Sequence, residues 1–239
     1  MRRAIVLGGN GQVGSACSRQ LVSAGWQVTS TGLTEHRFPH DLRDAGVTFI
    51  QSDRYNADDL HDVLRRGAEV VVDCVGYTAA HARLLLPFSH SIGSMVFISS
   101  KAVYVDDQGR HSNSDVPPEF GAPVTEEQPT VAPASDIDYD SREGYGRNKV
   151  AAEQVLLDSD LRVSVLRPSR IHGVGAARPR EWVFAKRVLD RRSHVVLAHA
   201  GRGLNHPTAA VNLAALVEFC AMNLARASST AQTPTHRTA

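Results

Sequence analysis

Short apolar runs rich in valine and isoleucine alternate with longer, more polar stretches along most of the chain. The apolar runs predict strands over 4–7, 26–31, 47–51, 69–75, 95–99 and 162–166. The intervening stretches predict helices over 15–24 and 58–66, which are followed by Gly25 and Gly67. Because apolar strands that alternate with helices are typical of a parallel sheet covered on both faces, we expect an α/β fold.

Two regions depart from this alternation. Residues 105–142 are rich in proline, aspartate, serine and glycine and lack periodicity, which predicts a long loop. Loops of this length in compact domains usually have a function or are disordered, so the segment is either a substrate lid or a disordered surface loop. The stretch 227–239, rich in serine, threonine and alanine, predicts a disordered tail.

The composition narrows the class of protein. The chain has 239 residues, 42% of them hydrophobic, enough for the core of one sizeable α/β domain. A formal net charge of +1 and few aromatic residues argue against a protein that binds nucleic acid or a membrane surface. Cys17, Cys74 and Cys220 have no metal-like spacing, so we expect no metal site. Without a secretory signal or membrane span, the sequence predicts a cytoplasmic protein.

A glycine-rich turn, Gly8-Gly9-Asn10-Gly11-Gln12-Val13-Gly14, joins the first predicted strand to the first predicted helix. Glycines at such positions permit a tight turn, let the backbone approach a pyrophosphate and let the helix pack closely on the strand. The helix N-terminus then faces the negative charge. The motif predicts a dinucleotide site whose contacts come from Gly8, Asn10, Gly11, Gln12, Val13 and Gly14.

Tyr145 and Lys149 lie in a stretch that predicts a helix, and their spacing places both side chains on one face. A tyrosine, with a usual pKa of about 10, becomes an effective acid or base at neutral pH only when that pKa is lowered. A nearby ammonium group favours the phenolate and can lower it. This spacing often arises by chance, but beside the glycine turn it indicates hydride transfer between a nicotinamide cofactor and a substrate carbon.

These motifs together resemble the extended short-chain dehydrogenase/reductase superfamily, in its NAD-dependent epimerase/dehydratase branch. The resemblance runs from Arg3 to about Leu224. It implies a Rossmann-type doubly wound parallel sheet with a small, reduced C-terminal substrate-binding part. We expect the dinucleotide-binding Rossmann domain at 1–170, with 105–142 as an inserted loop, and the substrate-binding part at 171–226.

Further segments match cofactor-binding positions of the family. The resemblance places Asp53 against the adenine, Val75 and Gly76 along the cofactor, and Ser169 beside the nicotinamide and substrate.

The end of the second predicted strand bears on the choice between NAD and NADP. NAD enzymes usually carry an acidic residue there for the ribose hydroxyls, whereas this chain has Thr29-Ser30-Thr31-Gly32. The missing acid, with Thr31 and either Arg37 or Arg54 nearby, favours a 2′-phosphate. We therefore expect NADP, with NAD as the alternative.

The resemblance also assigns the catalytic roles. It makes Tyr145 the general acid/base, and Lys149 the residue that lowers its pKa and holds the nicotinamide ribose. Ser100 becomes the hydrogen-bond partner of the substrate oxygen. Strand alternation points Ser99 away from the side that Ser100 faces, so we prefer Ser100 for this role.

Departures from the family pattern limit the substrate. Lys101-Ala102 stands where sugar dehydratases have an acidic pair, which argues against a 4,6-dehydratase. The C-terminal part is short, so a full nucleotide-sugar pocket is not assured. Six residues could line a pocket for an anionic or polar substrate: Arg178, Arg180, Trp182, His199, Arg202 and His206. His172 is expected to lie closer to the nicotinamide than these residues.

The leading interpretation is an NAD(P)-dependent oxidoreductase, either a ketoreductase or a sugar-type epimerase. Its substrate would be small and polar, and a nucleotide sugar is one option. We expect no nucleic-acid or membrane partner, and a homodimer is one option for assembly. The alternative is a non-catalytic dinucleotide-binding regulatory or scaffold protein. Such proteins usually lack the tyrosine or the lysine, whereas both residues are present here.

Overall fold

The fold is built on a seven-stranded parallel sheet, seen in a computed structural model that describes residues 1–197, 206–223 and 230–231. The strands lie in the order β3-β2-β1-β4-β5-β6-β7, and every neighbouring pair is parallel. Their bounds are β1 Arg3–Leu7, β2 Gln27–Gly32, β3 Thr48–Gln51, β4 Ala68–Asp73, β5 Ile92–Ile98, β6 Val163–Leu166 and β7 Thr230–Ala231. The expected Rossmann-type doubly wound sheet is confirmed, with chain order reversing between β1 and β4.

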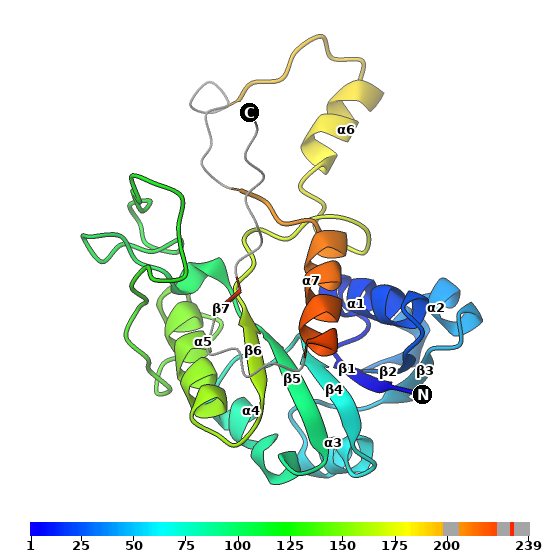
Figure 1. Cartoon of the computed structure of the whole chain (residues 1–239). Coiled ribbons are helices and arrows are strands. Elements are labelled where there is room, and N and C mark those ends of the chain that lie inside the picture. The colour runs from blue at the N-terminus through cyan, green and yellow to red at the C-terminus, as the bar shows by residue number, and fades with distance from the viewer. Residues whose placement is uncertain (198–205, 224–229, 232–239) are drawn as a thin grey trace.

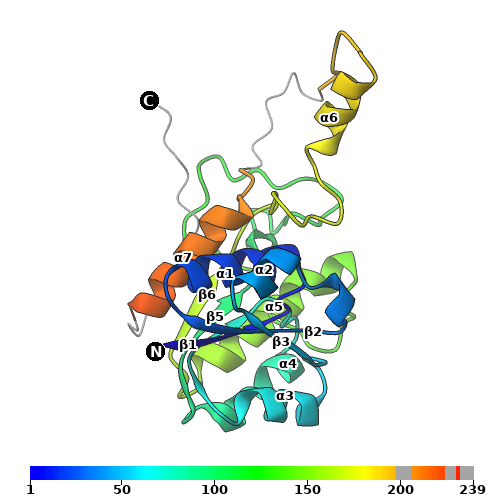
Figure 2. The ribbon, with the colours of Figure 1, turned by 90° about the vertical axis from the view of Figure 1, so that its right-hand side faces the viewer.

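Helices cover both faces of this sheet (Figures 1 and 2). One face carries α1 (Gln12–Ser23), α2 (His40–Asp44) and α7 (Ala210–Met222), and the other carries α3 (Ala57–Leu64), α4 (Ala79–Arg83) and α5 (Arg142–Leu157). Short 3-10 helices lie in the connections: η1 (Glu35–Arg37), η2 (Leu86–Phe88) and η3 (Lys101–Val103). Helix α6 (Trp182–Leu189) extends away from both layers and buries none of its residues.

The central strands are apolar at successive positions because each face of the sheet has its own core. In β4, Val70 and Val72 pack into the layer that contains α1 and α7, whereas Val71 packs into the layer that contains α3 and α5. All three valines are fully buried. A strand covered on both sides needs no polar face, which is why continuous apolar runs predict a parallel sheet.

The predicted strands and helices are present, with ends displaced by a few residues. Strand β5 begins at Ile92 rather than at residue 95 and so includes Gly93. A Cβ at Gly93 would lie only 2.7 Å from the Glu69 carbonyl oxygen, so this glycine reflects a close approach of β4. Helix α7 has no clear polar face, and without one it gives little helical periodicity in the sequence.

The expected substrate-binding part, 171–226, contains two different kinds of structure. Helix α7 packs on α1 and contributes Leu213 and Val217 to the sheet's core, whereas α6 is exposed. In the expected tail, Thr230–Ala231 pair with β6 as β7. The remaining positions of 227–239 lie outside the described residues.

The predicted long loop, 105–142, contains no helix or strand before α5 begins at Arg142. An isolated antiparallel bridge joins Tyr104 to Thr130 at its base. The carboxylate of Asp106 accepts hydrogen bonds from the backbone amides of Gln108, Arg110 and Glu119. Burial alone would raise the pKa of Asp106, but these amides and the Arg110 guanidinium hold it well below its usual range. The loop is therefore organised around one buried carboxylate.

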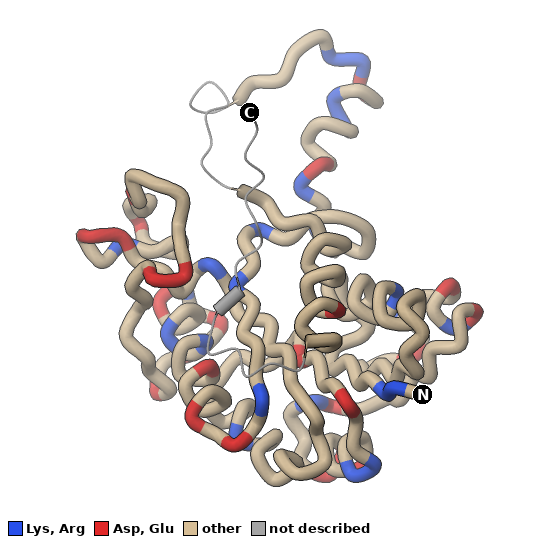
Figure 3. Tube along the Cα trace, viewed as in Figure 1, with Lys and Arg blue, Asp and Glu red and all other residues tan. Residues whose placement is uncertain are grey.

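Positive and negative side chains are interspersed along most of the trace (Figure 3). Of the helices in the described part of the chain, none is both long and apolar enough to cross a bilayer. In the same part of the chain, no group of three or more histidine, cysteine, aspartate or glutamate side chains is arranged to hold a metal ion.

Candidate active site

The glycine turn lies between β1 and α1, at the carboxyl edge of the sheet. Gly8 has a φ of +84°, and a Cβ at Gly14 would lie 2.2 Å from the Gly8 carbonyl oxygen. Gly11 is the N-cap of α1, and no side chain caps the helix there. The first amides of α1 are therefore left without a side-chain acceptor, an arrangement that suits a phosphate.

Two buried polar atoms lie close to this turn, at the carboxyl end of β2. Asn10 Oδ1 and Thr31 Oγ1 have no hydrogen-bond partner among the described residues. The Asn10 amide nitrogen donates to the Thr34 carbonyl oxygen at 2.6 Å, which fixes the side chain beside Gly32. Buried polar atoms without partners are costly, and a ligand that bonds to them would satisfy them. Together with the free helix N-terminus, they fit the polar part of a dinucleotide.

Arg54 is placed differently from the sequence-based expectation. Its guanidinium lies in the interior, 2.7 Å from the Asp73 carboxylate, and it also donates to the His81 carbonyl oxygen at 3.0 Å. Burial alone would raise the pKa of Asp73, but the ion pair with Arg54 lowers it. Arg54 is thus committed to a buried ion pair rather than exposed to a cofactor phosphate. Asp53 lies beside it, partly buried, and accepts a hydrogen bond from the Tyr55 amide.

Val75 and Gly76 follow β4, and Val75 packs against the glycine turn. A Cβ at Gly8 would meet Val75 Cγ1 at 2.7 Å, so the Val75 side chain packs directly on the Gly8 backbone. The Gly76 carbonyl oxygen accepts a hydrogen bond of 2.6 Å from Lys149 Nζ. These contacts connect the glycine turn, the end of β4 and helix α5 at the point where chain order reverses.

Lys149 is fully buried on α5. Its ammonium donates to the carbonyl oxygens of Gly76 and Ile98, and it lies 4.5 Å from the centroid of the Tyr77 ring. Burial lowers the pKa of Lys149 to about 8, although the negative charges of Asp73 and Glu153 act in the opposite direction. The lysine is thus held by two backbone carbonyls, one just after β4 and one at the end of β5.

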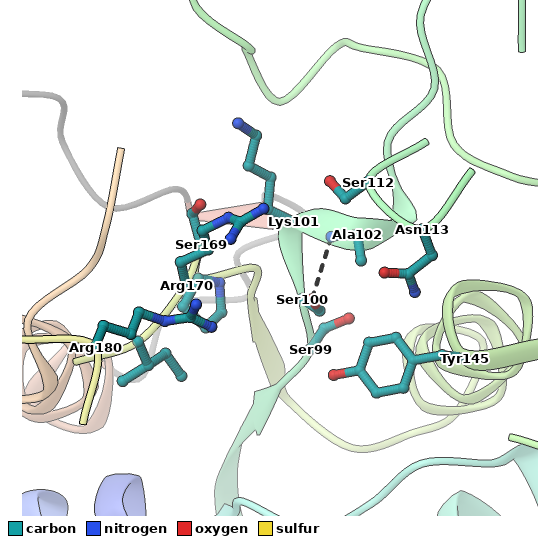
Figure 4. A pocket seen from close by; sticks show the side chains of 12 residues that line it. Ser99, Ser100, Lys101, Ala102, Ser112, Asn113, Tyr145, Ser169, Arg170 and Arg180 are labelled. Atoms are coloured by element: carbon teal, nitrogen blue, oxygen red, sulfur yellow. Dashed lines mark hydrogen bonds between the residues drawn. The ribbon is translucent and has the colours of Figure 1, made fainter. Parts of the chain in front are cut away.

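Tyr145 lies one turn before Lys149 and faces Ser100, the residue that follows β5 by two positions (Figure 4). Burial raises the pKa of Tyr145, and the Ser100 hydroxyl lowers that pKa to a lesser degree. The sequence-based expectation is a lowered pKa for Tyr145, whereas in this structure its pKa is raised. Ser100 Oγ also accepts a hydrogen bond from the Ala102 amide at 3.1 Å, which fixes its orientation.

Ser99 and Ser100 have different partners. Ser99 Oγ is hydrogen-bonded to the carboxylate of Glu153 on α5. That carboxylate also accepts a bond of 3.1 Å from Arg167 Nε, which leaves Ser99 inside a buried ionic network. Ser100 Oγ has no such ionic partner among the described residues, and Ser100 is the serine that influences the pKa of Tyr145.

Two aromatic residues near the site were missed by sequence reasoning. The rings of Tyr77 and Tyr139 stack with their centroids 5.4 Å apart, and Tyr77 lies 6.4 Å from the Tyr145 ring. Tyr77 directly follows Gly76, so extending the predicted cofactor segment by one residue would have found it. Tyr139 lies in the long loop, where no periodicity indicates which side chains turn inward.

A cavity of about 390 Å³ opens beside Ser100 and Tyr145. It is bounded by the ends of β5 and β6, by the start of α5 and by the long loop (Figure 4). Its lining residues are Ser99, Ser100, Lys101, Ala102, Ser112, Asn113, Tyr145, Pro168, Ser169, Arg170, Ile171 and Arg180. The expected Ser100, Tyr145 and Ser169 therefore share one cavity, to which the long loop contributes Ser112 and Asn113.

The other residues proposed for a pocket are spread more widely. Only Arg180 of that set lines the cavity in the described part of the chain. His172 is bound to Glu181 through an Nδ1–Oε1 distance of 2.9 Å, and Trp182 is exposed on α6. Arg178 and His206 are exposed, whereas His199 and Arg202 lie outside the described residues.

Comparison with solved structures shows the same fold in epimerases and a dehydratase. A putative epimerase from Burkholderia cenocepacia J2315 is 22% identical, with a TM-score of 0.68 over 99% of this chain and 76% of that chain. A UDP-glucose 4-epimerase is 18% identical, with a TM-score of 0.67 over 97% and 75% of the two chains. A dTDP-glucose 4,6-dehydratase from Bacillus anthracis str. Ames, in complex with NAD, is 15% identical, with a TM-score of 0.67 over 94% and 73%.

At these identities the solved structures establish the fold alone. No curated protein matches the sequence. The sequence pattern of the family described as "NAD dependent epimerase/dehydratase family" matches residues 4–204, which is most of the chain. The chain therefore belongs to the NAD dependent epimerase/dehydratase family.

Proposed function

We propose that this protein is an NAD(P)-dependent oxidoreductase that transfers a hydride between nicotinamide and a carbonyl or alcohol carbon of a small polar substrate. The observation that supports this most directly is that Ser100 and Tyr145 line one cavity, with the buried Lys149 one helical turn from Tyr145. The family membership supports the cofactor and the general class of reaction.

The cofactor site is proposed from residues that fit each part of a dinucleotide. The amides at the start of α1 would hold the pyrophosphate, and Asn10 and Thr31 offer unpartnered oxygens for polar groups of the adenosine half. Val75 and Gly76 would border the cofactor where it passes β4. Once bound, the nicotinamide supplies or accepts the hydride, and the protein supplies position and proton transfer.

Tyr145 would act as the proton donor to a substrate oxygen. Because burial raises the pKa of Tyr145, its phenol stays protonated at neutral pH, which is the form needed when a carbonyl gains a hydride and its oxygen becomes basic. Ser100 would donate a second hydrogen bond to the same oxygen and stabilise the developing negative charge. The protonated phenol favours the reduction of a carbonyl, which is the half-reaction that a ketoreductase and an epimerase share.

Lys149 would position the cofactor and compensate the negative charge that Tyr145 gains when it loses its proton. Its ammonium is fixed by two carbonyl oxygens and has a third N–H available for a ribose hydroxyl. A positive charge at this depth would also stabilise a tyrosinate, so proton loss from Tyr145 becomes less costly during the reaction.

The cofactor preference is proposed as NADP. The carboxyl end of β2 carries Thr31 in place of an acidic residue, and the nearby Glu35 is bound to Arg43 at 2.8 Å. Arg54 is paired with Asp73, whereas Arg37 is exposed. We therefore propose that Arg37 binds the 2′-phosphate.

The long loop is proposed as a substrate cover, because Ser112 and Asn113 line the cavity. The guanidinium of Arg142 on α5 donates to the carbonyl oxygens of Asn113 and Ser114 and pairs with Asp115 at 3.0 Å. These contacts hold the loop against the start of the helix that carries Tyr145. We propose that this arrangement excludes water from the reacting atoms.

The test is the replacement Tyr145→Phe, which keeps the ring and removes the proton. After a screen of small ketones, aldehydes and nucleotide sugars with NADPH and NADH has found turnover, this variant should lose about 10²- to 10⁴-fold in kcat. Its affinity for NADPH should be unchanged. Tyr104→Phe is a matched control, because Tyr104 is buried away from the cavity lining and should keep near-normal turnover.

Unchanged turnover in Tyr145→Phe would refute the catalytic assignment. NADPH binding without any turnover in the wild-type protein would instead favour a non-catalytic dinucleotide-binding role.

A further inference from the structure

The cavity beside Tyr145 is lined by three cations from three separate segments. Lys101 follows Ser100 and begins η3, Arg170 follows β6, and Arg180 precedes α6. All three lie on the other side of Ser99 and Ser100 from Tyr145 (Figure 4). The lining residues include serines and an asparagine but no aspartate or glutamate among those that the structure describes. The cavity therefore has a formal charge of one sign.

These cations are not neutralised by neighbouring side chains. Among the described residues, none of the three forms an ion pair, and the adjacent Glu181 is bound to His172. The ammonium of Lys101 lies 5.5 Å from the centroid of the Phe120 ring, a cation–π contact that leaves its formal charge in place. Other basic residues at this end of the sheet do pair, as Arg167 does with Glu153.

Two further features indicate that this arrangement costs stability. Burial lowers the pKa of Lys101, and the positive charge of Arg170 lowers it further. Arg170 also has a φ of +31°, in the left-handed region that non-glycine residues seldom adopt. Repulsion between cations and a strained backbone are typical of a binding site whose ligand compensates for both.

We propose that the substrate carries a phosphoryl group that Lys101, Arg170 and Arg180 bind, while its carbonyl oxygen lies at Ser100 and Tyr145. This rests on the proposed function, because it names the substrate class of the same cavity. A phosphate monoester has a charge near −2 at neutral pH and three acceptor oxygens. It matches three cations and the nearby hydroxyls of Ser112 and Ser169 better than a single carboxylate does.

The cavity cations are separate from the groups that fit the cofactor pyrophosphate. The pyrophosphate position is the start of α1, next to β1, whereas the cations lie at the ends of β5 and β6. The substrate phosphate and the cofactor would therefore bind at the same time, on either side of the reacting carbon.

Inorganic phosphate is the probe for a binding test on the full chain, by isothermal titration calorimetry at constant ionic strength and with saturating NADPH. We expect wild type to bind it, and Lys101→Gln, Arg170→Asn and Arg180→Gln each to weaken binding about tenfold. Asparagine is chosen at residue 170 because it tolerates a positive φ. Arg162→Gln, at the opposite end of β6, is the matched control and should bind like wild type.

Loss of phosphate binding when NADPH saturates the protein would overturn the proposal, because the cations would then serve the cofactor. Equal binding by wild type and all three cavity variants would also overturn it. Binding of phosphate by Tyr145→Phe should equal that of wild type. If the wild-type protein binds phosphate in this cavity but turns over no carbonyl substrate, the proposed function is refuted and this inference stands.

A second measurement compares kcat/KM for dihydroxyacetone, dihydroxyacetone phosphate and pyruvate. We expect the phosphorylated ketone to be reduced at least about tenfold more efficiently than the neutral one, and Arg170→Asn to remove that difference. Preference for pyruvate would identify a carboxylate site and would overturn the phosphoryl assignment.

Discussion

At the scale of single residues, the buried Lys149 is the group whose titration is most accessible to experiment. Burial gives it a folded-state pKa of about 8, whereas an exposed lysine has a pKa of about 10.4. Between these two values the unfolded chain binds more protons than the folded one. The contribution of Lys149 to the free energy of unfolding therefore increases as the pH rises from about 8 towards 10.

Lys149→Met should remove this pH-dependent contribution. Urea unfolding of both proteins at several pH values between 7.5 and 9.5 would measure it as the change in their stability difference. The comparison between variants matters because Tyr55 and Tyr77, whose pKa values burial raises, contribute the opposite slope at higher pH in both proteins. A difference that stays constant across this range would show that Lys149 does not titrate there.

The same residues show why the pKa values and ion pairs of the site could not be predicted from the sequence. Tyr145, Lys149 and Ser100 could be chosen because their segments resemble the family pattern. Their pKa values depend on what buries them, and burial comes from segments far away in the chain. The partner of Arg54 could not be predicted for the same reason: Arg54 follows β3, Asp73 ends β4, and only the fold brings the two charges together.

At the scale of elements, α6 and α7 differ in what they contribute to stability although both are rich in apolar residues. Leu213 of α7 is fully buried in the core, whereas Leu189 of α6 is 72% exposed. Leu213→Ala should lower the free energy of unfolding by about 2–5 kcal/mol because it leaves a cavity. Leu189→Ala should change it by less than about 0.5 kcal/mol. Urea denaturation of the two variants measures both values.

A large loss of stability in Leu189→Ala would mean that α6 is covered by another part of the protein or by a second molecule. An unchanged stability in Leu213→Ala would contradict the packing of α7 on α1.

The elements that could be predicted from the sequence are those whose position in the fold leaves a local pattern. A strand such as β4 must be apolar throughout, and a helix such as α1 must begin where glycines allow it, so both leave a local pattern. The long loop leaves none. Asp106 organises it through backbone amides, and nothing in the local sequence distinguishes this carboxylate from the other acidic residues of the loop.

At the scale of the whole molecule, the two halves of the sheet meet at the glycine turn, between β1 and β4. A ligand that binds there contacts elements from both halves and should stabilise the domain as a unit. Binding only to the folded state adds about 2.7 kcal/mol when the ligand is at 100 times its Kd. We therefore expect NADPH to raise the Tm by several degrees, and NADH at the same concentration to raise it less.

Gly11→Ala separates this stabilisation from the stability of the fold itself. A Cβ at Gly11 would meet only the Gly8 carbonyl oxygen, at an ordinary 3.4 Å, and the φ of −79° suits alanine. The variant should unfold at the wild-type temperature without ligand, but its methyl group would stand where the pyrophosphate approaches, so NADPH should raise its Tm much less. Ser23→Ala, at the other end of α1, is the control and should keep the full shift. A full NADPH shift in Gly11→Ala would show that the dinucleotide does not bind over this turn.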